Sequence, residues 1–199
     1  MTQPTYTPRQ SIIAGERIYL STFRVEDVPT LTRWFSQLDV TAFIGMQGTA
    51  YTLEQEQQWY ENYVKQSHTE RHFAVIDAHT HQLIGNVSLM DIRQVHQRAE
   101  LGIVIGDRAY WSKGYGREAI KLICQYGVAF LNLQTIYLWY VSYNVRGRKS
   151  YEAAGFVETG RIPESRLFNG VRYDDVVMTL HARNVHTTAL QGQFGQLPI

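Results

Sequence analysis

A glycine-containing turn is the first part of the chain that could bind a ligand. Lys113-Gly114-Tyr115-Gly116 follows a predicted strand and opens a predicted helix. Glycines let successive backbone N–H groups point the same way, and these groups together with the helix dipole form a site suited to a pyrophosphate. By itself the motif is equally typical of plain backbone geometry at a helix start.

A second segment, one predicted strand later, adds a polar side chain and a phenol. Asn144 opens a short predicted helix, Tyr151 lies seven residues further on, and Gly155 stands at the C′ position that ends it. Asn144 can cap this helix, and a helical tyrosine is most often a core or edge aromatic. It is therefore the two segments together, at this separation, that indicate a catalytic site.

Further motifs accompany these two segments: Asp27-Val28-Pro29, Trp34, Glu100-Leu101-Gly102, Tyr110 to Ala119, Arg146, Tyr151-Glu152, Gly155-Phe156, Phe168-Asn169-Gly170, Tyr173-Asp174 and Val176-Val177-Met178. With them, the chain resembles the Gcn5-related N-acetyltransferase (GNAT) superfamily over about residues 13–181. It is most similar to the branch of ribosomal-protein N-terminal and spermidine acetyltransferases. Trp111 stands where the family pattern has Gln or Arg, and Gly147 where Ala or Ser is usual.

The resemblance implies that acetyl-coenzyme A (acetyl-CoA) binds between two splayed strands, 99–105 and 136–141. Backbone groups of Ile103, Val104 and Ile105 would pair with its pantetheine arm, and Asn144 would bond to the same arm. Arg146 or Lys149 would reach the nucleotide phosphates. The N–H groups of residues 112–117 would hold the pyrophosphate, and this turn consists of Ser112, Lys113, Gly114, Tyr115, Gly116 and Arg117. Trp111, just before it, is a further expected cofactor-binding residue.

Acetyl transfer to an amine needs a base, an oxyanion donor and an acid. The resemblance implies an N–H group near Ile103 as the oxyanion donor and Tyr151 as the acid beside the sulfur. Glu100 matches a position used as a base, directly or through water, although it is equally well interpreted as an exposed strand-end residue. No covalent intermediate is expected, and Cys124 is interpreted as a core residue.

The acceptor pocket should lie across the sheet from the cofactor. Its expected wall residues are Trp34, Phe43, Trp59, Tyr60, Phe168 and Asp174. Asp174 and Asp175 alternate along a strand, so at most one of them should face the pocket. The acceptor itself stays open among a protein N-terminus, a polyamine, an amino sugar, an aminoglycoside and an amino acid. The absence of a net negative charge argues against a strongly polycationic one.

The hydrophobic pattern predicts an α+β fold with a mixed sheet. The resemblance implies the GNAT fold, in which a mostly antiparallel sheet of about seven strands is flanked by about four helices. The predicted strands are 16–23, 73–77, 83–92, 99–105, 136–141, 156–168 and 171–181, the last two joined by the turn dipeptide Asn169-Gly170. The predicted helices are 26–37, 52–66, 114–131 and 144–154. A capping box of Thr52 and Gln55 opens the second helix.

Length and composition are those of one folded domain. The chain has 199 residues, 44% of them hydrophobic, and we expect an arm over 1–11, a domain over 12–182 and a flexible tail over 183–199. With a net charge of +1, the chain lacks the large excess of positive charge that is typical of proteins that bind nucleic acid or anionic lipid. No apolar run spans a membrane, the N-terminus lacks signal-peptide features, and the single cysteine excludes disulfides and Cys-based zinc sites. A cytoplasmic enzyme without a metal, and a possible homodimer, are expected.

Two rival functions compete with acetyl transfer. Gly114, Gly116 and Ala119 imitate a dinucleotide-binding fingerprint, but the glycines lie eight residues beyond the strand end at Gly106, where that fold needs a tight turn. The second rival is a non-catalytic module that binds coenzyme A as a sensor or for interaction. Tyr151 and Glu100 argue against it.

Overall fold

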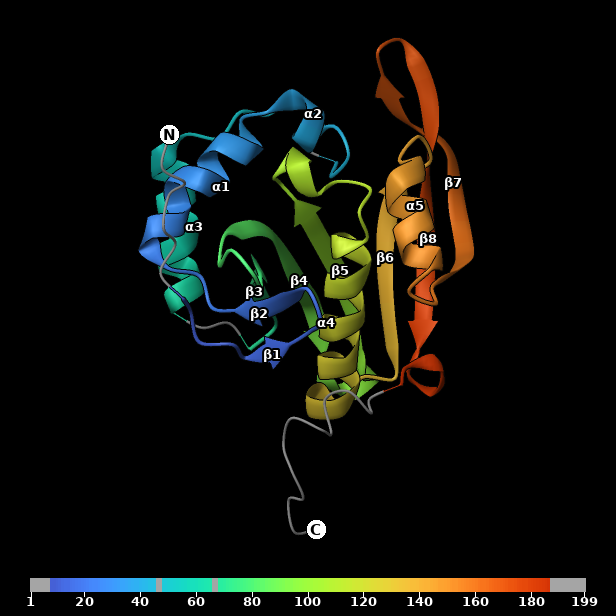
Figure 1. Cartoon of the computed structure of the whole chain (residues 1–199). Helices are drawn as coiled ribbons and strands as arrows, with labels where there is room; N and C mark the ends of the chain where they lie inside the picture. Colours follow the sequence, from blue (N-terminus) through green and yellow to red (C-terminus); the bar gives the residue numbers. More distant parts are fainter. Residues whose placement is uncertain (1–7, 46–47, 66–67, 187–199) are drawn as a thin grey trace.

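The computed structural model describes residues 8–45, 48–65 and 68–186, which build one eight-stranded sheet (Figure 1). The spatial order is β1-β2-β3-β4-β5-β6-β8-β7, and all neighbours are antiparallel except β5 and β6. The predicted α+β class with a mixed, mostly antiparallel sheet is confirmed. The strands are β1 (Ile13–Ala14), β2 (Ile18–Ser21), β3 (Arg71–Asp77), β4 (Leu83–Arg93), β5 (Arg98–Ile105), β6 (Thr135–Val141), β7 (Val157–Phe168) and β8 (Val171–His181). The two-residue β1 is the strand that the sequence pattern missed.

The described part of the chain forms five α-helices, one more than predicted, because the single turn α2 follows α1 as a separate element. Thr52 and Gln55 form the predicted capping box, in which the Gln55 N–H donates to Thr52 Oγ1 and the Thr52 N–H donates to Gln55 Oε1. The helices are α1 (Val28–Phe35), α2 (Leu38–Thr41), α3 (Leu53–Val64), α4 (Tyr115–Leu131) and α5 (Val145–Glu152). No helix in the described ranges is long and apolar enough to span a membrane.

The sheet buries an apolar core on each face. Along β3, Phe73 and Val75 belong to the main core, whereas Ala74 and Ile76 belong to a second one. The main core lies beneath α4 and α5, and α4 packs against β2, β4 and β5. The second core includes Leu31 of α1, with Trp59 of α3 packed against it. This alternation follows from the two-residue period of a strand, and it produces the two helical layers of Figure 1.

The sheet opens between β5 and β6. The two parallel strands pair only where Arg98–Glu100 meets Thr135–Tyr137. Beyond Glu100, the remaining five residues of β5 diverge from β6, as the resemblance implied. The first turns of α4 and α5 lie on either side of this opening (Figure 1), so the splay places two helix starts beside one unpaired strand segment.

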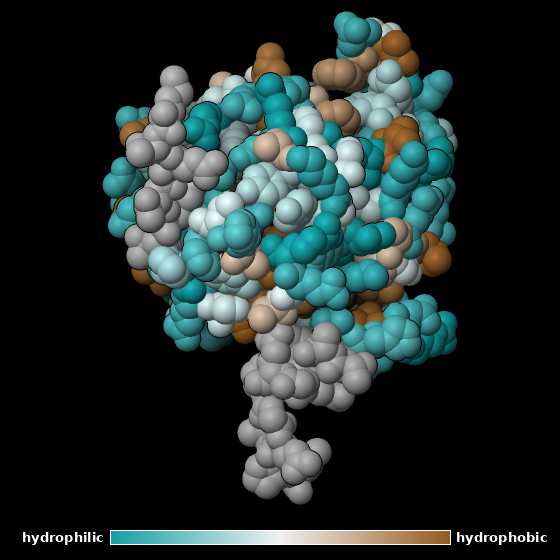
Figure 2. Space-filling model, in the orientation of Figure 1, coloured by the Kyte–Doolittle hydropathy of each residue, from teal (hydrophilic) through white to brown (hydrophobic). Residues whose placement is uncertain are grey.

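The β7–β8 hairpin projects past the end of the sheet (Figure 1). Asn169 and Gly170 form its turn with φ of 49° and 75°, as the dipeptide predicts. The register shifts between Ile162 and Arg166, where Pro163 interrupts the ladder. Exposed apolar residues near the tip include Leu167, and Figure 2 shows brown atoms among teal ones at this end of the hairpin.

The end segments pack more closely than the sequence pattern predicted. Arg9, in the predicted arm, forms a buried ion pair with Asp27. At the other end, Val185 packs against the main core and Gln125 Nε2 donates to the His186 carbonyl at 2.7 Å. Residues 1–7 and 187–199, the rest of the predicted arm and tail, lie outside the described residues.

The ends of two helices are exposed. Val64 is the last residue of α3 and Phe130 lies in the last turn of α4, and both side chains are exposed. On α3, a charged residue, Glu56, is buried instead.

Candidate active site

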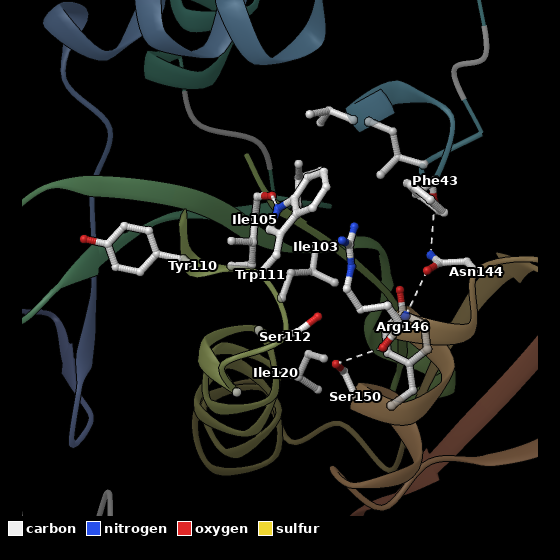
Figure 3. A pocket seen from close by; sticks show the side chains of 17 residues that line it. Phe43, Ile103, Ile105, Tyr110, Trp111, Ser112, Ile120, Asn144, Arg146 and Ser150 are labelled. Carbon is white, nitrogen blue, oxygen red and sulfur yellow. Dashed lines mark hydrogen bonds between the residues drawn. The ribbon is translucent and has the colours of Figure 1, made fainter. Parts of the chain in front are cut away.

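A groove follows the opening between β5 and β6, with a cavity volume of about 120 Å³ (Figure 3). The unpaired segment of β5 forms one wall and the first two turns of α5 form the other. Val40, Phe43 and Ile44, from α2 and the residues after it, border the groove as well. Most of the sequence-predicted cofactor residues meet here: Ile103, Val104, Ile105, Trp111, Ser112, Gly114, Gly116, Asn144 and Arg146 line it together with Tyr151. Lys113, Arg117 and Lys149 are exposed and do not line it.

The turn before α4 has the backbone geometry of an anion cradle. Gly114 is the N-cap residue with φ of +87°, and Ser112 also has a positive φ of 58°. The first N–H groups of an α-helix lack partners within the helix. A Cβ on Gly116 would lie 3.5 Å from Ile105 Cγ1, so the glycine leaves space between the helix start and β5. These features fit the pyrophosphate of coenzyme A.

Arg146 reaches across the groove from α5. Its guanidinium carbon lies 3.7 Å from the centroid of a Trp111 ring and 5.1 Å from that of Phe43. Trp111 in turn donates from Nε1 to the Ile105 carbonyl at 2.5 Å, as Figure 3 shows. Burial lowers the pKa of Arg146, yet guanidinium stays charged in proteins. The Trp111 side chain thus occupies the family's Gln/Arg position with a ring that holds a cation.

Asn144 caps α5 and also forms a hydrogen bond to the segment after α2, at Phe43. Its Oδ1 accepts from the Gly147 N–H at 2.8 Å, and its Nδ2 donates to the Phe43 carbonyl at 3.3 Å. A Cβ on Gly147 would lie 2.6 to 2.9 Å from the Asn144 amide. The glycine that departs from the family pattern is therefore the residue that this capping geometry requires.

Tyr151 lies where the groove meets a second cavity. It lines both spaces, as do Phe43, Ile44, Ile103 and Val104. Only 8% of the residue is exposed, and its ring centroid is 5.8 Å from that of Tyr140. Burial is the main cause that raises its pKa to about 12. The phenol is therefore protonated at neutral pH.

The second cavity, called here the acceptor cavity, has a volume of about 550 Å³ and lies on the other side of Tyr151. Three carboxylates line it: Glu56 from α3, Glu100 from β5 and Asp175 from β8. Asp175 accepts from Arg166 Nε at 2.9 Å. Burial raises the pKa of Glu56 and that of Glu100, and a hydrogen bond with Tyr137 opposes the rise at Glu100. Asn86 contributes a buried Oδ1 that has no hydrogen-bond partner in the described chain.

The acceptor residues expected from the sequence are distributed differently. Phe43 and Trp59 line the cavity, whereas Trp34, Tyr60, Phe168 and Asp174 do not. Trp34 is a core residue, and a Cβ on Gly106 would lie 2.0 Å from its ring. Tyr60 lines a separate hollow beside α3, and the Phe168 ring packs on Tyr143.

Strand alternation decides between the two neighbouring aspartates. Asp174 pairs with Arg161 Nη1 at 2.7 Å and accepts from the Glu164 N–H at 3.0 Å, outside the cavity. Asp175 is the one that faces the cavity. Of these two neighbours, Asp175 therefore lines the cavity, and Asp174, which the sequence predicted as a wall residue, does not. Glu56 carried no signal in the sequence, because its helical position looked like that of any solvated glutamate.

The single cysteine, Cys124, does not line the groove. Cys124 is buried in α4, and burial raises the pKa of its thiol, so the thiol is an unreactive core group. Within the described ranges, no three His, Cys, Asp or Glu side chains are grouped so that they could hold a metal ion.

Comparisons with known proteins agree with this geometry. The model of the acetyltransferase (GNAT) domain family matches residues 17–157. A spermidine N(1)-acetyltransferase of Vibrio cholerae is 40% identical over 118 residues, which cover 58% of this chain and 66% of that relative. A probable N-acetyltransferase of Bacillus subtilis, YjcK, is 31% identical over 133 residues, 65% of this chain and 73% of the relative.

Solved structures show the same arrangement. The structure of spermidine N-acetyltransferase from Vibrio cholerae in complex with CoA and spermine superposes with a TM-score of 0.77 at 26% identity, covering 85% of this chain and 98% of that one. A GNAT-family acetyltransferase from Bacillus anthracis, 20% identical, shares the fold with a TM-score of 0.74. The family match, the splayed sheet and the glycine cradle lead to one conclusion: the chain belongs to the GNAT family and is an acetyl-CoA-dependent N-acetyltransferase.

Proposed function

We propose that the acceptor is a primary amine that carries at least one further cationic group, as polyamines do. The observation that carries this proposal is the Glu56 carboxylate in the wall of the acceptor cavity. Glu56 is only 5% exposed, and its carboxylate makes no hydrogen bond or ion pair with any described residue. A buried carboxylate without a partner is costly. A cationic group of the acceptor would supply the missing partner.

The rest of the cavity supports the same acceptor. Glu100 and the unpartnered Oδ1 of Asn86 add two further groups that attract an ammonium ion. The aromatic ring of Trp59 provides an apolar wall for a methylene chain. The net charge of +1 argued against a polycation, but local charge in the cavity determines binding more than the total does. The Vibrio cholerae relative is named for spermidine, and its structure was solved with spermine.

The residues around the junction divide the chemistry among them. The bound donor supplies a thioester, which the amine attacks directly. We assign the oxyanion contact to the N–H group near Ile103 and proton donation toward sulfur to Tyr151, whose neutral phenol lies between the two cavities. A strand rises about 3.3 Å per residue, so the Cα atoms of Glu100 and Ile103 are about 10 Å apart. Glu100 would therefore deprotonate the amine through water.

On the donor side, Ile103–Ile105 would pair with the pantetheine arm, and the N–H groups after Ser112 would bind the pyrophosphate. Asn144 keeps one amide hydrogen for the arm, because its other groups hold Gly147 and Phe43. Arg146 is placed inside the groove and can turn from the Trp111 ring to a phosphate.

The test measures thiol release with acetyl-CoA and matched acceptors. We expect spermidine and spermine to give kcat/KM values at least a hundredfold above that of n-butylamine or of a dipeptide with a free N-terminus. Glu56→Gln should reduce the preference for spermidine over butylamine by about 10- to 100-fold, the range for one hydrogen bond to a charged group. Glu61→Gln, on the exposed face of the same helix, is the matched control. Equal rates with butylamine and spermidine would contradict the proposal, and no thiol release with any amine would favour a non-catalytic coenzyme A sensor.

A further inference from the structure

We propose that Arg17 is a positioning residue for the phosphate-binding turn, residues 112–116. Arg17 immediately precedes β2, about one hundred residues from the turn, and belongs to none of the motifs in the sequence. Its Nη1 donates to the Lys113 carbonyl at 2.8 Å. Its guanidinium carbon also lies 4.8 Å from the centroid of the Tyr115 ring. One side chain thus contacts two residues of the turn.

Glu118 fixes the orientation of Arg17. Its Oε2 accepts from Arg17 Nε at 3.0 Å, while its Oε1 accepts from the backbone N–H groups of Glu16 and Arg17 at 2.8 and 2.9 Å. Glu118 lies in the first turn of α4. The pair therefore joins the start of β2 to the start of α4, and the guanidinium is held although 43% of the Arg17 side chain is exposed.

The contact with Lys113 matters because a phosphate-binding turn must direct its N–H groups at the anion and keep its carbonyl groups away from it. A donor on the Lys113 carbonyl holds that group in place and offsets its partial negative charge. Arg17 also brings a positive charge to the turn. A Cβ placed on Gly114 would lie 3.1 Å from Arg17 Nη2 and 3.7 Å from Arg117 Nη2, so two guanidinium groups flank this glycine.

A purely structural role would have a different signature. Half-exposed ion pairs contribute little to folding stability. We therefore expect the loss of Arg17 to change donor binding much more than thermal unfolding. The inference concerns only the donor site, and a failure of the polyamine proposal would leave it unaffected.

The experiment is a calorimetric titration of Arg17→Ala and Arg17→Lys with CoA and with dephospho-CoA. Arg17→Ala should weaken the binding of both ligands about tenfold, the effect of one lost hydrogen bond to a charged group together with a less ordered turn. Arg17→Lys keeps the positive charge but loses the planar guanidinium with its several N–H donors, so its affinity for CoA should lie between those of the wild type and Arg17→Ala. The matched control is Arg33→Ala, an exposed arginine of α1, which should bind like the wild type. The midpoint of thermal unfolding without ligand should fall by no more than about 3 °C.

Steady-state kinetics give the second measurement. In Arg17→Ala the KM for acetyl-CoA should rise, whereas kcat should stay within twofold of the wild type, because Arg17 does not line the groove. Unchanged CoA affinity in Arg17→Ala would overturn the inference. Weaker binding of CoA but not of dephospho-CoA would also overturn it, in favour of a direct contact with the 3′-phosphate. If Arg17→Ala does not fold, Arg17→Lys decides: a severalfold loss of affinity supports the inference, and wild-type affinity contradicts it.

Discussion

Replacement of Tyr151 by phenylalanine tests the chemistry at the junction most directly. The Tyr151 hydroxyl makes no hydrogen bond with any described residue, although the ring is buried against Tyr140 and Phe156. Phenylalanine keeps those ring contacts. We therefore expect the free energy of unfolding to change by less than about 0.5 kcal/mol. Whatever the substitution does to turnover then reports on the hydroxyl alone.

The size of the effect follows from the pKa of the phenol. Burial raises the pKa of Tyr151 to about 12, whereas a thiol has an ordinary pKa of about 8.5. Complete proton transfer from the buried phenol to a thiolate of ordinary pKa would thus cost about 5 kcal/mol. A hydrogen bond to the developing thiolate is worth about 1.5 to 3 kcal/mol. We expect kcat to fall by about 10- to 150-fold in Tyr151→Phe, with the Kd for CoA within threefold of the wild type.

The assay is steady-state thiol release at saturating acetyl-CoA, with calorimetry for CoA and thermal unfolding as controls. Turnover within twofold of the wild type would refute the assignment of Tyr151 as the acid. A loss of several thousandfold would refute the hydrogen-bond argument and indicate complete proton transfer in the rate-limiting step. Tyr140→Phe, which changes the neighbouring phenol, is the matched variant and should retain turnover.

Three further predictions concern other parts of the chain. Gly114→Val should weaken CoA binding at least tenfold in calorimetry, because the backbone φ of Gly114 is +87° and a Cβ would approach Arg17. The control is Gly170→Val, at a φ of +75° with open space around it, which carries the same backbone strain far from the groove and should bind CoA normally. Burial raises the pKa of Glu100, so its base form accumulates only as the pH rises through that raised pKa. The kcat/KM for the amine should therefore rise with pH over the same range. If the pH profile of Glu100→Gln keeps this rise, Glu100 is not the base. Asp27→Asn breaks the buried pair with Arg9 and should cost about 3 kcal/mol, a fall of about 6 to 12 °C in Tm, with unchanged activity of the folded protein; a shift below 2 °C would contradict this estimate.

Local patterns in the chain predicted most of the elements and most residues of the groove, although β1 and α2 were missed. Three of these patterns depend only on residues a few positions apart, so the sequence alone is enough to recognise them. They are the Asn169-Gly170 turn, the Thr52–Gln55 capping box and the glycine turn that opens α4. The groove residues Ile103–Ile105, Gly114 and Asn144 come from such segments as well. The motifs could predict these groove residues because a cradle of backbone N–H groups is built from consecutive residues.

Tertiary structure alone decided the acceptor side and the support of the phosphate-binding turn. Glu56 and Asp175 reach one cavity from α3 and β8, and nothing in the sequence near either residue marks it as a cavity residue. Asp174 and Asp175 are equal candidates until the register of β8 against its neighbours fixes which one faces inward. Arg17 meets Lys113 across 96 positions. Burial and contacts between distant segments arise only when the sheet has formed, because they depend on what the other strands and helices place nearby.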